Sequence, residues 1–403
     1  MTRFYISIKK GKKQIPDFSE ITSIGNNVLS KCFLNCDSLK VSLPFSELIT
    51  VNNYGLNETF KNCTGLTGSI SFPELTTVGQ YGLASTFYGC TGLTGSVSFP
   101  ELTTISENHE FQSTFYNCTG LNGTVSFPKL TTISGQHGLG STFYGCTRLT
   151  SISFPKLTTV YDYGMDQAFS GCTRLTSISF PKLTTVYNYG MDQAFSGCTG
   201  LTSISFSELT TVYNYGMRKV FYSCTGLTGS VSFPELIIIS GNYGLSNAFS
   251  GCKNIASVSF PKLTTISGQY VFASCFSGCT GLTSISFPEL TTISGKNGLY
   301  SAFYGCTGLT SISFSELTNV NGSNGLQRTF GNCTGLTSIS FPKLTTTSFG
   351  SATNQFNTML IGVTGCTVHF PSNLESVIGS WTDVTAGFGG TNTTVLFDLT
   401  ATS

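Results

Sequence analysis

The sequence predicts a repeat solenoid, a rod of short parallel strands stacked rung upon rung. One unit of 26 to 28 residues returns along the chain, and a cysteine marks each copy. Apolar residues recur at the same places of every unit, yet one rung is too small to bury them, whereas stacked rungs bury them against each other. The marker cysteines are Cys36, Cys63, Cys90, Cys118, Cys146, Cys172, Cys198, Cys224, Cys252, Cys279, Cys306 and Cys333.

Composition excludes several classes of protein. The chain has 403 residues, with 33 Phe, 17 Tyr and only 10% charged residues, so it is too aromatic and too uncharged to be disordered. Lys and Arg number 20 and Asp and Glu number 19, a balance that attracts neither nucleic acid nor an anionic membrane. No run of eighteen apolar residues occurs, so we expect no membrane insertion.

Residues 1–20 are predicted to form an N-terminal cap. Two strands, Phe4–Ile8 and Gln14–Phe18, flank a turn at Gly11. The four lysines around this turn suit a solvated hairpin tip, with a basic docking patch as the alternative. The segment lacks the apolar stretch of a signal peptide, and no anchor is visible at the other end. A chain acting outside a cell would then need an unusual export route or a particle that carries it.

Residues 21–346 are predicted to form the solenoid. In the stretch L-T-S-I-S-F, Ile and Phe alternate with Ser, which is typical of a strand with one face inward. The Pro that follows ends this strand, and the L-T-T-I after it predicts a second, shorter strand. Leu56 precedes Phe60 by four residues, a spacing that recurs between units and predicts one or two helical turns.

Two columns of phenylalanines are predicted to fill the core of the stack, with stacking worth about 0.5–1.5 kcal/mol per pair beyond burial. One column lies three residues before each cysteine: Phe33, Phe60, Phe87, Phe115, Phe143, Phe169, Phe195, Phe221, Phe249, Phe276, Phe303 and Phe330. The other closes the strand: Phe45, Phe72, Phe99, Phe127, Phe154, Phe180, Phe206, Phe233, Phe260, Phe287, Phe314 and Phe341.

Two departures from the regular unit carry their own predictions. Five units hold one extra residue after the Leu, such as Gly68, Gly95 and Gly229, which predicts a β-bulge or a longer turn. Residues 347–403 lose the register and are predicted to cap the C-terminal end. That segment starts with a degenerate rung, Cys366–Pro371, and later carries Trp381 and a strand-like stretch at Val395–Asp398.

The repeated motif F-x-x-C-x-x-L-T-S-I-x-[FIL]-P, as in FYGCTRLTSISFP at 143–155, resembles the BspA-like leucine-rich repeat. The resemblance spans roughly residues 21–346. It implies a right-handed solenoid of about twelve full rungs, with a parallel sheet on one face and short second strands and helical turns on the other. Members of the family are bacterial and protist surface proteins that act in adhesion and partner binding. This chain has Y-G-[LM]-x-x-x-F where the family has I-G-x-x-A-F, and a phage tail or other virion protein would account for the absent signal peptide and anchor.

An aromatic column is the best candidate for a binding surface. Rings stand nine residues before the cysteines, and Tyr161, Tyr187 and Tyr213 form a second column two residues earlier. Tyr offers a rigid amphipathic surface that suits sugars and protein partners. The alternative is that stacked rings merely cover the rung edges. The candidate ligand-binding residues are Tyr161, Tyr163, Tyr187, Tyr189, Tyr213, Tyr215, Tyr243 and Tyr270.

Cysteine and histidine are weak candidates for chemistry. The column cysteines are expected to be small buried hydrophobes with a weak donor. The pair Cys275 and Cys279 has C-x-x-x-C spacing but no second pair of ligands, so we expect no zinc site. His109 and His137 are neighbours in the aromatic column, but a metal would need a third and fourth ligand, for which only Glu107 and Glu110 are near in sequence. We expect ordinary surface histidines.

A charged column follows the strand Phe by two residues. It predicts a solvated stripe that keeps an otherwise uncharged surface soluble, with a sign-striped docking face as the alternative. Its members are Glu47, Glu74, Glu101, Lys129, Lys156, Lys182, Glu208, Glu235, Lys262, Glu289, Glu316 and Lys343.

These patterns predict a binding protein with no catalytic residues and no cofactor, because a repeat supplies like groups in rows and a catalytic site needs unlike groups that converge. The expected partner is a cell-surface glycan or protein, met by a surface adhesin or by a receptor-binding component of a phage or other virion. The alternative is a structural spacer or assembly protein of a larger particle, with particle or homo-oligomer contacts through the capped ends.

Overall fold

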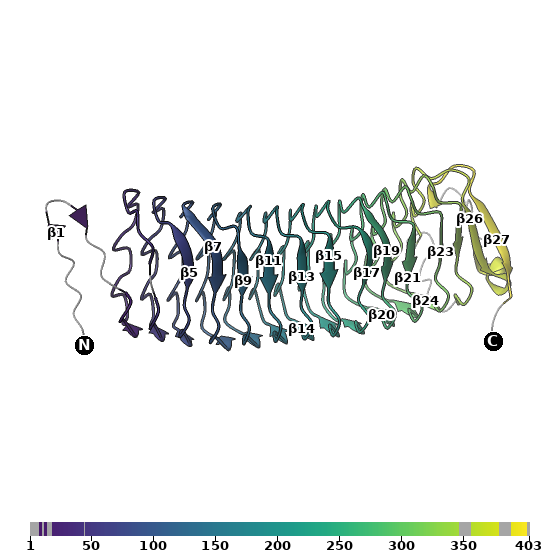
Figure 1. The fold of residues 1–403 in the computed structure, drawn as a ribbon. Coiled ribbons are helices and arrows are strands. Elements are labelled where there is room, and N and C mark those ends of the chain that lie inside the picture. The colour runs from purple at the N-terminus through teal and green to yellow at the C-terminus, as the bar shows by residue number, and fades with distance from the viewer. Residues whose placement is uncertain are drawn as a thin grey trace.

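The chain winds into one long solenoid of parallel turns, which confirms the predicted fold class (Figure 1). The computed structural model describes residues 18–43, 45–345, 356–378 and 388–400, together with two short strands at 8–9 and 12–13. Neighbouring turns keep the sequence repeat in register, so that Ser177 lies opposite Ser203 and Ile178 opposite Ile204.

A first row of strands, here called the serine row, runs along one side of the solenoid (Figure 1). In the regular strands of this row the Ile or Val between the serines points inward while the flanking Ser face solvent, as in β13, where Ile178 is buried. The row comprises β5 (Gly68–Ser71), β7 (Leu93–Ser98), β9 (Thr124–Ser126), β11 (Ser151–Ser153), β13 (Ser177–Ser179), β15 (Ser203–Ser205), β17 (Gly229–Ser232), β19 (Ile255–Ser259), β21 (Ser284–Ser286), β23 (Ser311–Ser313), β25 (Ser338–Ser340), β26 (Thr367–Pro371) and β27 (Thr394–Leu399).

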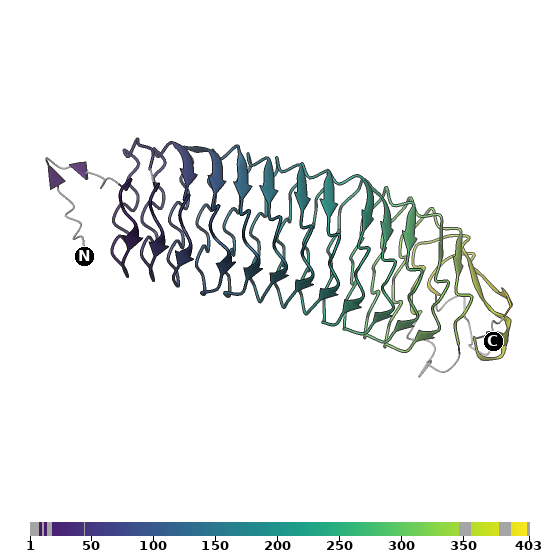
Figure 2. The ribbon, with the colours of Figure 1, turned by 60° about the horizontal axis from the view of Figure 1, so that its bottom comes forward.

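The second strands predicted from L-T-T-I form a parallel row of their own, the threonine row, which Figure 2 shows beside the serine row. Threonine hydroxyls link its turns, since Thr158 Oγ1 donates to the Thr131 carbonyl at 3.0 Å. The row comprises β3 (Ser23–Ile24), β4 (Thr50–Val51), β6 (Thr77–Val78), β8 (Thr104–Ile105), β10 (Thr132–Ile133), β12 (Thr159–Val160), β14 (Thr185–Val186), β16 (Thr211–Val212), β18 (Ile238–Ile239), β20 (Thr265–Ile266), β22 (Thr292–Ile293) and β24 (Asn319–Val320).

The predicted helical turns are wrong. The segment between the threonine row and the cysteine is a ribbon of consecutive turns, for example over residues 52–63. Tyr54, Glu58 and Asn62 have φ of 56°, 53° and 60°, so every fourth residue lies in the left-handed region that an α-helix excludes. A positive φ at the third residue of a turn is what a type II turn requires.

Hydrogen bonding explains why the ribbon replaces a helix. The Thr59 N–H donates to the Leu56 carbonyl within its own turn, and the next N–H, that of Phe60, donates to Thr86 on the neighbouring rung at 2.9 Å. A helix would satisfy these groups internally and leave none for the neighbour. Because the ribbon also repeats every four residues, Leu56 and Phe60 both face the core, and their spacing alone resembles that of a helix.

Both predicted phenylalanine columns are confirmed as core. Phe195 is fully buried, and its ring stacks between those of Phe169 and Phe221 at centroid distances of 5.5 and 5.8 Å. The strand-closing column stacks alike, with Phe154 and Phe180 at 5.6 Å. Each rung therefore buries its rings against the rungs on both sides.

The strand pairing is irregular beside two of the glycines for which a β-bulge or a longer turn is predicted. The strand register shifts after Gly68 in β5 and after Gly229 in β17. Gly68 and Gly229 have φ values of 85° and 72°, which residues other than glycine rarely adopt.

The two ends of the chain hold further short elements. Near the N-terminus, β1 (Ile8–Lys9) and β2 (Lys12–Lys13) pair antiparallel, closer to the turn than the predicted strands. Residues 4–7 and 14–17 of those strands lie outside the described residues, as does Trp381, and Phe18 belongs to the core. The degenerate rung is confirmed, because β26 pairs in parallel with β25 and then with β27. A short helical segment, η2 (Ser372–Leu374) and α2 (Glu375–Ile378), follows β26. None of the helices in the described part of the chain is long and apolar enough to cross a membrane.

Candidate functional site

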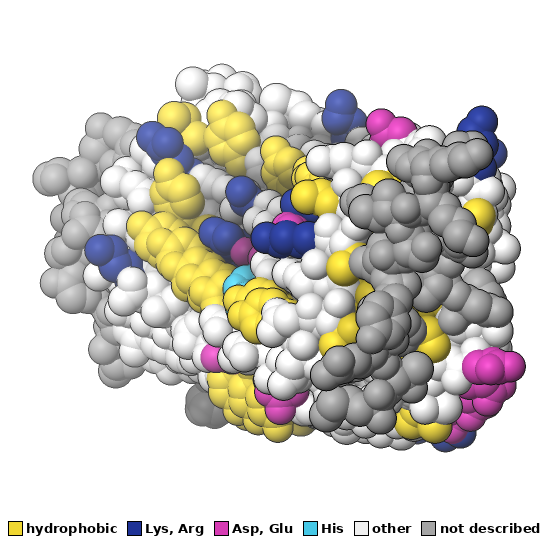
Figure 3. Space-filling model, turned by 90° about the vertical axis from the view of Figure 1, so that its left-hand side faces the viewer, with side chains coloured by type: hydrophobic (Ala, Val, Ile, Leu, Met, Phe, Trp, Pro, Cys, Tyr) yellow, Lys and Arg dark blue, Asp and Glu magenta, His cyan; other side chains and the backbone are white. Residues whose placement is uncertain are grey.

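The eight candidate tyrosines lie in two stacked columns on the turn ribbon and at its start. The main column is a continuous stack of nine rings with successive centroids 4.5 to 5.2 Å apart. Figure 3 shows a row of hydrophobic side chains interrupted by a histidine that runs along the surface. The main column consists of Tyr54, Tyr81, His109, His137, Tyr163, Tyr189, Tyr215, Tyr243 and Tyr270.

Local backbone geometry orients these rings. Each of the nine residues has a positive φ, between 53° and 61°, at the same place of its turn. Because the backbone has the same conformation at this position of each rung and the rungs are in register, the side chains are parallel. The rings of Tyr163, Tyr189 and Tyr215 stack with successive centroids 4.5 Å apart and interplanar angles of 5° and 4°. Inside the stack both faces of each ring contact neighbouring rings, and the nine rings are half-buried.

The outer column contains Tyr161, Tyr187 and Tyr213. Their centroids lie 4.5 and 4.7 Å apart, and the rings are parallel within 3°. Tyr161 ends the column toward the N-terminus and is 38% exposed. The sequence thus places all eight candidates correctly in columns, and Tyr243 and Tyr270 extend the main one.

Sequence reasoning missed a charged pair that borders the main column. Arg218 forms two hydrogen bonds with the buried Asp192, at 3.0 and 2.6 Å. These bonds raise the pKa of the guanidinium, which also lies 5.2 Å from the centre of the Tyr215 ring. Burial raises the pKa of the neighbouring Asp166 to about 7, with a further contribution from Asp192. The sequence does carry a signal for this ion pair, because Asp192 and Arg218 have opposite charges and occupy the same position of adjacent units.

The histidines belong to the aromatic column. His109 and His137 stack at 5.2 Å, and His109 Nδ1 lies 3.0 Å from the Gln112 Oε1. Burial, with a smaller effect of His109, lowers the pKa of His137. Across the described ranges, no three His, Cys, Asp or Glu side chains lie close enough to hold a metal ion.

Glu110 is buried where neighbouring rungs have glycine. Its Oε1 accepts the N–H groups of Ser106 and Glu107 at 2.7 and 2.5 Å, while its Oε2 has no partner in the described part of the chain. Burial raises the pKa of this carboxyl to about 8, so the group is mostly neutral at pH 7. Glu110 closes a turn and does not face the solvent.

The structural role predicted for the column cysteines is confirmed. Cys198 is fully buried, and its thiol donates to the Phe169 carbonyl of the preceding rung at 3.2 Å. Burial raises the pKa of these thiols, to about 12 for Cys252. All fifteen cysteines lie in the described part of the chain, and none of them is in a disulfide there.

The charged column makes ion pairs at four of the five places where its sign changes. Lys129 pairs with Glu101 at 2.6 Å and Lys182 with Glu208 at 2.5 Å. The side chains are about 40–60% exposed, so each pair contributes at most about 1 kcal/mol. This geometry agrees with a solvated stripe.

Comparisons with known proteins agree with this architecture. A family model described as "BspA type Leucine rich repeat region (6 copies)" matches residues 22–163, 139–275 and 246–377. The fold is similar to the crystal structure of a leucine-rich repeat protein from Bacteroides ovatus ATCC 8483, with 22% identity and a TM-score of 0.52 over 93% of this chain and 87% of that chain. A leucine-rich cell surface protein from Faecalibacterium prausnitzii A2-165 matches at 17% identity and a TM-score of 0.38, over 88% of this chain and 87% of that one. A comparison with curated proteins gave no match.

Proposed function

Since the chain belongs to the BspA-type leucine-rich repeat family, we propose that it is a non-enzymatic binding protein that recognises a glycan or protein on a cell surface. The proposed ligand site is the part of the two tyrosine columns between Tyr161 and Tyr270. The proposed setting is the outside of a cell or the surface of a virion, where such a protein meets its ligand.

The observation that carries the proposal is the stack of nine aromatic rings in the main column. Stacked, half-buried tyrosines are held rigid by their neighbours, so a ligand that contacts them immobilises few side-chain bonds. Their ring edges and hydroxyls offer apolar contact and hydrogen bonding together. A row of this kind suits an extended ligand with a repeating structure of its own.

A cell-binding experiment tests the proposal. Labelled protein is incubated with a panel of intact bacterial and animal cells, beside a variant with Tyr163, Tyr189 and Tyr215 changed to Ala. The matched control changes Tyr88, Tyr116 and Tyr144, a three-ring stack with centroids 4.7 Å apart elsewhere on the ribbon. We expect selective binding that the first variant loses and the control keeps, with both variants folded by circular dichroism.

Two other results would change the assignment. Binding that survives in the first variant would move the site to the exposed hydroxyls of the serine row or to an end of the solenoid. Absence of binding to every cell type would favour a spacer or assembly protein that docks through its ends.

A further inference from the structure

The outer tyrosine column ends at Tyr161, and the end of the column at this residue is here called the step. A cavity lies at the step. The cavity has a volume of about 390 Å³ and is lined by Asn108, Ser134, Gln136, Tyr161 and Asp162. Its volume falls in the lower part of the range of small-molecule sites, roughly 300–1,000 Å³. Tyr161 is one of the largest exposed apolar side chains of the described residues.

The step follows from a change in the repeat. In the rung of Tyr161, two residues lie between β12 and the main-column ring of Tyr163, whereas the preceding rung has three, Ser134, Gly135 and Gln136, between β10 and His137. A Cβ at Gly135 would collide with the Glu107 carbonyl oxygen, so no side chain can stand there. The place that a fourth stacked ring would occupy is therefore left open beside Tyr161.

We infer that this step is a carbohydrate-binding subsite, in which a sugar ring continues the tyrosine stack. Tyr187 covers one face of the Tyr161 ring at 4.5 Å, so the other face is available for stacking. The apolar C–H face of a pyranose complements the electron-rich face of an aromatic ring. This inference rests on the proposed function and names the chemistry of its ligand.

The polar groups around the step suit sugar hydroxyls. Asn108 Oδ1 accepts the Gln136 N–H at 2.9 Å, which holds the Asn108 side chain and leaves its NH2 as a donor. Asp162 contacts Asn188 at 3.5 Å through Oδ2 and supplies acceptors. Carboxylate, amide and hydroxyl groups together provide the donors and acceptors that vicinal hydroxyls require.

Charge selects among ligand classes. Asp162 is the one charged residue that lines the cavity, and no Lys or Arg lines it. A nucleotide or another phosphate ligand would meet a carboxylate without a compensating cation, so the site favours a neutral sugar.

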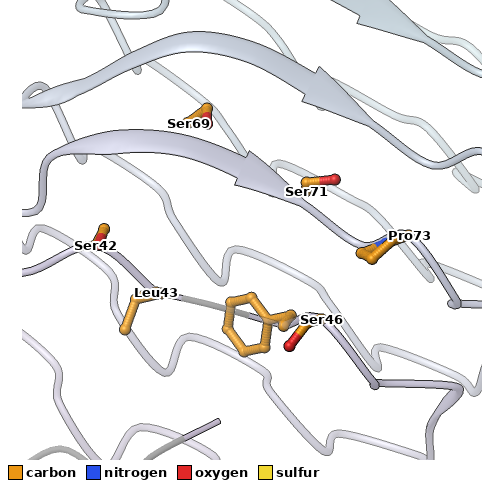
Figure 4. Close-up of a pocket in the computed structure, with 7 residues that line it drawn as sticks. Ser42, Leu43, Ser46, Ser69, Ser71 and Pro73 are labelled. Atoms are coloured by element: carbon orange, nitrogen blue, oxygen red, sulfur yellow. The ribbon is translucent and has the colours of Figure 1, made fainter. Parts of the chain in front are cut away.

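By contrast, a second hollow of about 290 Å³ near the N-terminal end is lined by Ser42, Leu43, Phe45, Ser46, Ser69, Ser71 and Pro73 (Figure 4). It has neither a carboxylate nor an accessible ring face, because Phe45 is buried.

The test is saturation-transfer difference NMR with the full chain and the methyl glycosides of glucose, galactose, mannose, N-acetylglucosamine, N-acetylgalactosamine and fucose. We expect at least one glycoside to bind, Tyr161→Ala to weaken it by about tenfold or more, and Tyr161→Phe to keep it, since the stacking face remains. Asp162→Asn should weaken binding to a smaller degree. The matched control is Tyr144→Ala, which removes the end ring of the separate Tyr88, Tyr116 and Tyr144 stack, outside the cavity lining and outside the proposed ligand site.

Either of two results overturns the subsite. One is that none of the six glycosides binds at millimolar concentration; the other is that Tyr161→Ala and Tyr144→Ala weaken binding equally. Failure here is separable from failure of the proposed function. Cell binding that persists without glycoside binding removes only the subsite, whereas glycoside binding that depends on Tyr161, without binding to any cell, removes only the proposed cellular role.

Discussion

Replacing Phe195 by alanine tests whether stacked phenylalanines hold the solenoid together. The ring is fully buried and stacks between Phe169 and Phe221, with Phe180 of the other column 6.0 Å away. An aromatic side chain buries roughly 150–250 Å². At about 25 cal/mol per Å² this area corresponds to about 4–6 kcal/mol, an upper limit because the unfolded chain is itself partly compact.

Measured Phe→Ala changes in protein cores cost about 3–5 kcal/mol, since the lost transfer energy combines with the cavity left behind. We expect the same loss in the free energy of unfolding of Phe195→Ala, measured by urea unfolding followed by circular dichroism. The transition should also broaden, because each rung contacts only its neighbours and one weakened interface lets the two halves unfold separately.

The control is Tyr222→Ala, at a ribbon position where the ring is 40% exposed. Its unfolding free energy should stay within about 0.5 kcal/mol of the parent protein. A loss under about 1 kcal/mol for Phe195→Ala would refute the reasoning, because it would mean that the column does not carry the packing energy.

Three further predictions concern charge and thiols. Arg218→Met should lower the free energy of unfolding, measured by urea unfolding, by about 2–3 kcal/mol. This loss is smaller than for a fully buried ion pair because Arg218 is partly exposed. An unchanged free energy of unfolding would show that Asp192 needs no partner. Because the folded pKa of Glu110 is raised from 4.5 to about 8, the folded state binds the extra proton between these values, so stability should fall as pH rises from about 4.5 to 8. Glu110→Gln should flatten that fall in urea unfolding at several pH values, and an identical slope would contradict the burial of the acid. In the native protein a thiol reagent should react first with the partly exposed Cys32 and Cys36, and early labelling of the buried column cysteines would contradict their packing role.

Most of the architecture was predictable because the repeat carries the information many times over. A column such as that of Phe195 is apolar in every unit, and only stacking buries all of its members, so fold class and core followed from spacing. The strands of both rows followed as well, since Ser alternates with Ile and Pro ends the strand. The helical turns were the error, because a turn ribbon and a helix both bring residues such as Leu56 and Phe60 to one face.

The candidate site was predictable only in part. The sequence places Tyr161 and Tyr163 in columns, yet it does not show which ring face is left open. That depends on how Gly135 lies against Glu107 on the neighbouring rung. The ion pair of Arg218 with Asp192 also forms between rungs, between residues far apart in the sequence.

The sequence by itself determined the repeat, the two strand rows, the phenylalanine core and the tyrosine columns, because these depend on which residue types recur at which spacing. Only the tertiary structure decided the backbone between the threonine row and the cysteines and the cavity beside Tyr161. Both depend on contacts between neighbouring rungs. Backbone N–H groups that donate hydrogen bonds to the next rung favour turns over a helix. Gly135 lies so close to Glu107 of the neighbouring rung that no side chain fits there, which leaves one face of the Tyr161 ring uncovered.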